Sequence, residues 1–162
     1  MTAGILPSAP LTIAAALHAE LGKLEQFVAL LNQEQDYLQQ ADVDALLPLV
    51  DTKNTLVAEL SQLSAQRETA LLHAGIEPGR AGMNTWLARP GHASHAEAWQ
   101  KLLALAGEAR SLNILNGKLI GLHLQKNQQA FTALMSATNR AVTYGPDGQQ
   151  HSGLGGRFLG SA

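Results

Sequence analysis

Two long segments in the first half of the chain repeat apolar residues at alternating steps of four and three. In residues 11–41 the repeating positions are Leu17, Leu21, Leu24, Val28, Leu31, Gln35 and Leu38. In residues 43–75 they are Leu46, Leu49, Lys53, Leu56, Leu60, Leu63 and Arg67. Such spacing places one apolar seam along one side of a helix, where a second helix can pack. The pattern therefore predicts two long helices that form an antiparallel hairpin, or coiled coil.

The ends of these two helices carry weaker signals. Pro10 precedes the first helix, and Asp44 lies in the first turn of the second, where the helix dipole favours acidic side chains. Pro48 follows closely and is compatible with a kink or with a helix start near residue 48. Gly75 is suited to cap the C-terminal end of the second helix.

A third long helix is predicted over residues 94–142, a stretch without proline. With about 100° between successive residues, its apolar side chains fall into two sectors. One sector holds Leu112, Leu115, Leu119 and Leu122. The other holds Trp99, Leu102, Ala106, Ile120, Leu124 and Phe131. We expect one sector to pack on the hairpin and the other to remain for a partner; burial of both within one bundle is the alternative.

The second sector also contains Asn113 and Gly117. A glycine inside a helix is less favourable than alanine by roughly 1 kcal/mol, and close approach of another helix backbone is the usual compensation. The sequence therefore predicts that a second helix passes close to Gly117.

The remaining segments differ in composition from the three helices. Residues 76–93 form a connection rich in Pro and Gly, in which Trp86 and Leu87 are expected to pack against the hairpin. Residues 1–10 are expected to form an N-terminal tail, and residues 143–162 a flexible, Gly-rich C-terminal tail. The predicted fold class is all-α, with a long antiparallel helical hairpin, a third long helix packed alongside, and the flexible tail.

Composition supports a helical bundle and argues against other classes. Hydrophobic residues make up 46% of the 162 residues but aromatic residues only 4%, as is typical of helical bundles. With 11 basic and 13 acidic residues, the net charge of -2 argues against a nucleic-acid partner. No cysteine is present, which fits a reducing compartment. No apolar run approaches the roughly 20 residues that cross a bilayer, so we expect a cytoplasmic protein that does not insert into membranes.

The six histidines are the main candidates for catalytic chemistry, and their surroundings do not favour it. His92, His95 and Glu97 lie close in sequence, but a zinc site needs three or four ligands with supporting contacts. His123 begins a partial phosphorelay motif, H-x-x-K, that lacks the glycine expected next. We expect no catalytic residues, no metal and no cofactor, and therefore a protein that binds rather than catalyses.

Three stretches in the C-terminal half resemble the FlgN family. They are Asn113-Ile-Leu-Asn116-Gly117-Lys-Leu119-Ile120, Asn127-Gln128-Gln129-Ala130-Phe131-Thr-Ala-Leu134 and Thr143-Tyr144-Gly145-Pro146-Asp147-Gly148-Gln149. The spacing of Asp44, Lys53 and Arg67 with the intervening leucines is similar to the second helix of that family, so the resemblance extends over residues 17–149. Members of the family are cytoplasmic export chaperones of the bacterial flagellar type III secretion system.

The resemblance implies a function and a set of partners. The chain is expected to bind the C-terminal helical segments of the hook–filament junction proteins FlgK and FlgL, prevent their premature assembly, and deliver them to the export gate. The client-binding residues it suggests are Asn113, Gly117, Leu119, Ile120, Leu124 and Phe131. Tyr144 matches the family's tyrosine that docks on the export gate protein FlhA. The connection 76–93 departs from the family pattern in length and composition, and residues after Gln149 have no specific match.

Two other functions remain compatible with the sequence. One is a histidine phosphotransfer-like signalling domain with His123 as the phosphorylated residue, and the other is a generic coiled-coil adaptor. A homodimer in the absence of a client is also compatible with the pattern, because an exposed apolar stripe can close on a second copy.

Overall fold

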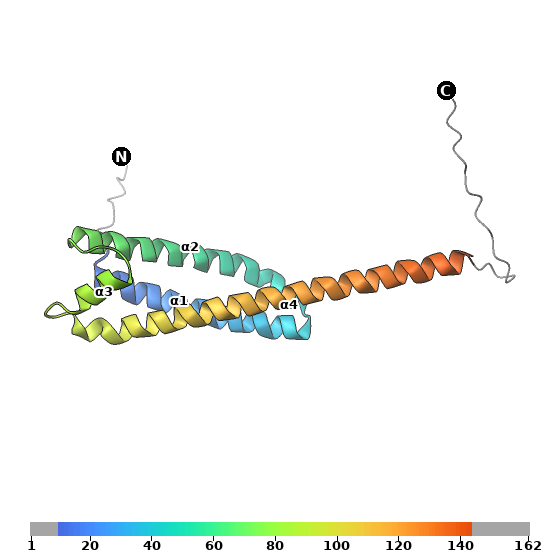
Figure 1. The fold of residues 1–162 in the computed structure, drawn as a ribbon, viewed down its shortest axis with the longest axis horizontal. Coiled ribbons are helices and arrows are strands. Elements are labelled where there is room, and N and C mark those ends of the chain that lie inside the picture. The colour runs from blue at the N-terminus through green and yellow to red at the C-terminus, as the bar shows by residue number, and fades with distance from the viewer. Residues whose placement is uncertain (1–9, 144–162) are drawn as a thin grey trace, which may run out of the picture. The chain divides into compact units, whose positions relative to one another are not determined.

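The computed structural model describes residues 10–143, with side chains described as far as residue 137, and these residues are all-α. The helices are α1 (Ile13–Gln40), α2 (Val43–His73), α3 (Arg80–Leu87), a 3₁₀ turn (Ala93–His95) and α4 (Ala96–Thr143). The chain divides into two compact units, residues 1–119 and 120–162, and α4 belongs to both. The all-α prediction of a helical hairpin with a third long helix alongside is confirmed (Figure 1). The predicted tails lie outside the described residues, except for Pro10 and the last residue of α4.

The hairpin between α1 and α2 is closed by two residues. Ala41 adopts a left-handed conformation with φ of 55°, and its N–H donates to the carbonyl of Leu38. The N–H of Asp42 donates to the carbonyl of Tyr37. The Asp42 carboxylate then accepts a hydrogen bond of 3.0 Å from the N–H of Ala45, which caps α2. Because this cap starts the helix at Val43, Pro48 lies inside α2 and does not mark its beginning.

The predicted seams of α1 and α2 are buried or half-buried along their length. Leu17, Leu31 and Leu71 are fully buried within the first unit. The two charged seam positions of α2 have charged partners on α1. Lys53 Nζ lies 2.9 Å from a carboxylate oxygen of Glu34, and Arg67 Nε lies 2.7 Å from one of Glu20. Charged residues are therefore accommodated in the seam because each meets an opposite charge on α1.

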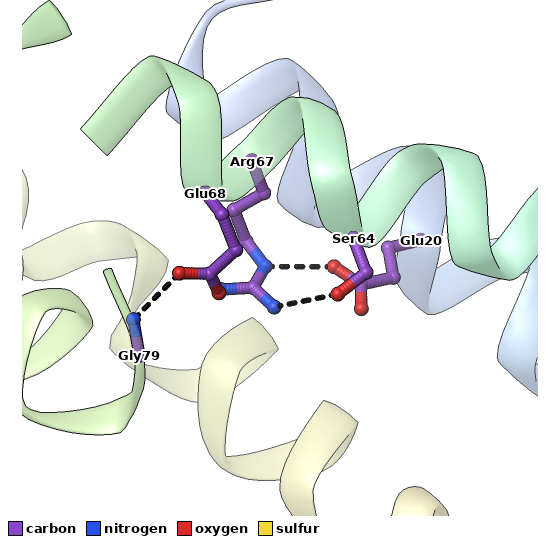
Figure 2. A network of polar contacts seen from close by, with 5 residues as sticks. All are labelled: Glu20, Ser64, Arg67, Glu68 and Gly79. Carbon is purple, nitrogen blue, oxygen red and sulfur yellow. Dashed lines mark hydrogen bonds and ion pairs between the residues drawn. The ribbon is translucent and has the colours of Figure 1, made fainter. Parts of the chain in front are cut away.

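Arg67 is the centre of a buried polar network, shown in Figure 2. Besides Glu20, its guanidinium contacts Glu68 at 2.6 Å, and it lies 5.2 Å from the centre of the Trp99 ring. Glu68 in turn accepts a hydrogen bond of 2.5 Å from the N–H of Gly79. The network therefore joins α1, α2, the connection after α2 and the start of α4.

The connection after α2 contains a helix of its own. Gly75, with φ of 70°, follows the last turn of α2, and the N–H of Ile76 donates to the carbonyl of Leu71, as in a Schellman cap. Helix α3 then buries Met83 and Trp86 against the hairpin, which confirms the predicted packing of Trp86. The connection between α2 and α4 therefore contributes Ile76, Met83 and Trp86 to the hydrophobic core of the first unit.

Candidate functional site

The first half of α4 packs through a seam with steps of three and four. We call this set the packing seam; it consists of Leu102, Leu105, Ala109, Leu112, Asn116 and Leu119. All six are buried or half-buried within the first unit. Contacts of His95 with His18, Lys101 with Glu25, and Asn116 with Glu34 show that α4 runs beside α1 in the same direction.

The two sectors predicted for this helix were partly wrong. Trp99 and Leu102 were assigned to the sector left for a partner, yet both are buried in the core. Leu115 and Leu122 were assigned to the packing sector, yet both are exposed. A seam that repeats every seven residues drifts by about 20° per heptad on a straight helical wheel. The straight helical wheel therefore assigned residues of the one continuous packing seam to two different sectors, with Leu102 in one and Leu112 and Leu119 in the other.

Asn116 is the polar member of the packing seam and is almost completely buried. Its Nδ2 donates to the main-chain carbonyl of Leu31 at 2.9 Å and to Glu34 Oε2 at 2.8 Å. Both oxygens of Glu34 also accept hydrogen bonds from Lys53 Nζ, at 3.0 and 2.9 Å. The Oδ1 of Asn116 is buried and accepts no hydrogen bond within the described residues. This cluster of hydrogen bonds joins α1, α2 and α4. The feature of the sequence that could have indicated it is an asparagine at a position of the packing seam.

In the second unit, the apolar face of α4 shifts by one residue. Positions that would continue the packing seam carry polar or small side chains, namely His123, Lys126, Ala130 and Ala133. Apolar residues instead follow a neighbouring line with steps of four and three, interrupted by Asn127. We call this line the outer stripe; it consists of Ile120, Leu124, Phe131, Leu134 and the adjacent Met135. Ile120, Leu124 and Phe131 are 43%, 64% and 64% exposed.

The six residues suggested for client binding do not all share this line. Ile120, Leu124 and Phe131 belong to the outer stripe. Asn113 and Gly117 are also exposed and extend the same line towards the N-terminal end of α4, because Gly117 precedes Ile120 by three residues and Asn113 precedes Gly117 by four. Leu119 belongs to the packing seam and is half-buried. A Cβ atom at Gly117 would meet nothing within 4 Å. The helix predicted to pass close to Gly117 is therefore not supplied by the described part of this chain.

Helix α2 carries a second exposed apolar line that the sequence analysis missed. Val43, Leu47, Val50 and Val57 are exposed, with Asn54 between the last two. We call these five residues the α2 stripe. Each of its last four positions directly follows a position of the predicted α2 seam, and this one-residue offset was the signal available in the sequence.

The loop histidines are engaged in packing. His95 Nδ1 lies 3.0 Å from His18 Nε2, and the rings of His92 and His95 pack on Trp86 at centroid distances of 4.5 and 5.4 Å. Within residues 10–137, no group of three or more His, Cys, Asp or Glu side chains is arranged to hold a metal ion. His123, the phosphorelay candidate, is half-buried. None of the helices over residues 10–143 combines the length and apolarity needed to cross a membrane.

Three long helices, two of which carry an exposed apolar stripe, are the features of a helical binding protein. The FlgN protein family matches residues 12–152 of this chain. The chain therefore belongs to the FlgN family of flagella synthesis proteins, which are flagellar export chaperones and not enzymes.

Individual relatives agree with this assignment. The flagella synthesis protein FlgN of Yersinia enterocolitica is 28% identical over 147 residues, covering 89% of this chain and 93% of the relative. The protein of the same description from Proteus mirabilis is 28% identical over 148 residues, covering 88% of this chain and 93% of the relative. A crystal structure described as a flagella synthesis protein FlgN from Pseudomonas aeruginosa has a TM-score of 0.60 at 22% identity. It covers 65% of this chain and 83% of that chain, and it supports the fold.

Proposed function

We propose that this chain is a cytoplasmic chaperone that binds the C-terminal helical segments of FlgK and FlgL and keeps them from assembling prematurely. The client helix docks on α4, with Ile120, Leu124 and Phe131 as the apolar anchors. Asn113 and Gly117 extend the contact towards the N-terminal end of the helix, and Leu119 borders it. The observation that carries this proposal is the exposed outer stripe in a chain of the FlgN family.

The spacing and charge of α4 suit a helical client. Apolar side chains at steps of four and three are the anchors by which one amphipathic helix recognises another. Between Glu108 and Asp147 the sequence contains basic residues and no acidic ones. A client segment with a negative net charge would therefore be attracted to this part of α4.

Delivery to the export gate is assigned to a separate segment. Tyr144 lies outside the described residues, and we propose that it docks on FlhA as the family's tyrosine does. Because the client and the gate then contact different residues, both can be bound at once.

The test of client binding compares two aspartate substitutions on the same helix. Ile120→Asp places a charge in the outer stripe, whereas Leu122→Asp places one at an exposed leucine on the other side of α4. Both variants are mixed with a peptide that contains the C-terminal helical segment of FlgK, and helicity is monitored by circular dichroism. Loss of co-elution in Ile120→Asp alone supports the proposal. Co-elution of a folded Ile120→Asp with the peptide overturns it.

A further inference from the structure

Helices α2 and α4 both pack on α1 and also meet each other. At one level of the first unit, the Arg67 guanidinium of α2 lies 5.2 Å from the centre of the Trp99 ring of α4. At a second level, Lys53 of α2 and Asn116 of α4 bond to the same oxygen of Glu34, at 2.9 and 2.8 Å. These contacts show that α2 and α4 are neighbours along this stretch.

The side of α4 that faces α2 can be followed from Trp99. In a helix packed with a seven-residue repeat, residues seven apart keep the same side. Asn113 follows Trp99 by fourteen residues, and Gly117 follows Asn113 by one turn. Trp99 is buried, whereas Asn113 and Gly117 are exposed. The side of α4 that meets α2 at Trp99 is therefore uncovered at Asn113 and Gly117.

The α2 stripe lies on the flank of α2 that faces α4. Glu59 of α2 bonds to Lys23 of α1 at 2.8 Å. Lys23 and Glu25 lie on opposite sides of α1, because they are two residues apart, and Glu25 is bonded to α4. The flank of α2 that holds Glu59 therefore faces away from α4. Val57, two residues from Glu59, lies on the other flank, and Val50 precedes it by seven residues.

Helix α3 covers the same sides of α2 and α4 at one end of the first unit. Met83 and Trp86 of α3 belong to one buried cluster with Leu71 of α2 and Trp99 of α4. Leu71 follows Val57 by fourteen residues, so it continues the side of α2 that Val57 exposes. Figure 1 shows α3 between α2 and α4 at this end. An amphipathic helix is therefore the kind of element that packs on this side of the α2–α4 pair.

Beyond α3, four exposed residues continue this side, and we call them the α2–α4 face: Val50, Val57, Asn113 and Gly117. None of them is charged. Because α2 and α4 run in opposite directions, Lys53 and Asn116 mark one level on both helices. At about 1.5 Å per residue, all four residues lie within about 6 Å of that level along the helix axes. About two turns of a partner helix therefore reach all of them.

We propose that the C-terminal helical segment of FlgK lies on the α2–α4 face and contacts α2 and α4 together, as α3 does at the other end of the first unit. This inference rests on the proposed function and adds Val50 and Val57 of α2 to the client-binding residues. The two valines are the apolar anchors on α2, Asn113 offers hydrogen bonds at the edge, and Gly117 lets the client backbone come close to α4. The side of the client that faces them is uncharged, because a charge there would lose its water without gaining a partner.

The test changes one residue of α2 that α4-only binding leaves out. Val57→Asp places a charge on the α2–α4 face, and Ala58→Asp places the same charge at the next residue, turned away by about 100°. Both residues are exposed, so both variants are expected to keep their helices, which circular dichroism checks. Isothermal titration with the FlgK peptide is expected to show affinity lowered by about tenfold or more in Val57→Asp and unchanged in Ala58→Asp.

The same titration on Ile120→Asp separates the two proposals. Full affinity in Val57→Asp, with binding lost in Ile120→Asp, overturns the role of α2 and leaves the proposed function standing. Equal weakening by Val57→Asp and Ala58→Asp also overturns the role of α2, because it reflects charge alone. If the peptide does not bind the unaltered chain, or binds Ile120→Asp and Val57→Asp equally well, both proposals are overturned.

Photocross-linking distinguishes direct contact from an indirect effect of the charge. The chain contains no cysteine, so a single benzophenone label can be attached through Val57→Cys or, as the control, through Thr55→Cys. Thr55 is exposed on the opposite side of α2 from Val57. The label at position 57 is expected to capture the FlgK peptide in clear preference to the label at position 55. Equal yields at the two positions overturn the contact with α2.

Discussion

The side-chain amide of Asn116 on α4 donates a hydrogen bond of 2.9 Å to the main-chain carbonyl of Leu31 on α1. A buried asparagine in an apolar seam favours the one register in which its amide finds partners. Here the partners are the Leu31 carbonyl and the Glu34 carboxylate, which is also held by Lys53 from α2. Displacing α4 by one heptad would place Ala109 or His123 at this point and leave Glu34 without its amide donor. Asn116 therefore helps to fix the register of α4 against α1. This register determines which residues of α4 pack on the hairpin and at which residue the exposed outer stripe begins.

Substitution of Asn116 tests this role. Asn116→Ala removes both hydrogen bonds and is expected to lower the free energy of unfolding by about 1 to 3 kcal/mol. Asn116→Asp, which has nearly the same shape, is expected to be more destabilising because it brings a second carboxylate against Glu34 in a buried site. Urea denaturation followed by circular dichroism measures both variants. Equal stabilities of the two variants would show that the contact with Glu34 does not matter.

The Arg67 network makes a separate prediction about the hairpin. Arg67→Met leaves the buried carboxylate of Glu20 without its partner, which is expected to lower the free energy of unfolding by about 3 to 5 kcal/mol. The double variant Glu20→Leu with Arg67→Met removes the stranded charge and is expected to be more stable than Arg67→Met alone. Thermal and urea denaturation of the single and double variants provide the comparison. A double variant less stable than Arg67→Met would contradict the argument.

The hairpin could be predicted from the sequence because its signal is local and repeated. Positions such as Leu17, Leu31 and Leu56 were assigned to seams from spacing alone, and all three are buried. The partners of the charged seam residues could not be assigned in the same way. Arg67 and Glu20 are 47 residues apart, and any of 13 acidic residues was available as a partner. Only the folded arrangement of the helices selects the pair.

The long helix shows where the periodicity argument fails. A straight wheel is accurate over a few turns, so it correctly grouped Ile120 with Leu124 and with Phe131. Over the three heptads from Trp99 to Ile120 the drift of a packed seam amounts to about 60°, and Trp99 was therefore grouped with residues it does not join. The buried role of Asn116 was missed because one polar residue among leucines does not reveal which neighbours it meets.

Gly82 gives a prediction that only the backbone geometry supports. A Cβ atom at this position would lie 1.8 Å from the carbonyl oxygen of Glu77, so Gly82→Ala forces α3 away from the preceding chain. We expect a loss of about 1 to 3 kcal/mol in the free energy of unfolding and a change in Trp86 fluorescence. Gly107→Ala on α4 is the control, because a Cβ there meets nothing within 4 Å. That variant is expected to be more stable by about 0.5 to 1 kcal/mol.

Gly117 is the position where stability and the proposed function are expected to diverge. Within the described chain a Cβ at Gly117 meets nothing, so Gly117→Ala should stabilise the helix by about 0.5 to 1 kcal/mol, as Gly107→Ala does. If a client helix lies against the backbone at Gly117, the added methyl group holds that helix away. Gly117→Ala is then expected to weaken binding of the FlgK peptide by about tenfold, which corresponds to about 1.4 kcal/mol.

Isothermal titration with the FlgK peptide, alongside thermal denaturation, separates the two effects. Gly107→Ala is the matched control, because it makes the same change in the same helix, away from Asn113, Gly117 and the outer stripe. It should raise the melting temperature and leave the affinity for the peptide unchanged. Gly117→Ala should raise the melting temperature equally and lower the affinity. Unchanged affinity in Gly117→Ala would place the client helix farther along α4, against Leu124 and Phe131 alone, because only a closely approaching backbone can sense one methyl group.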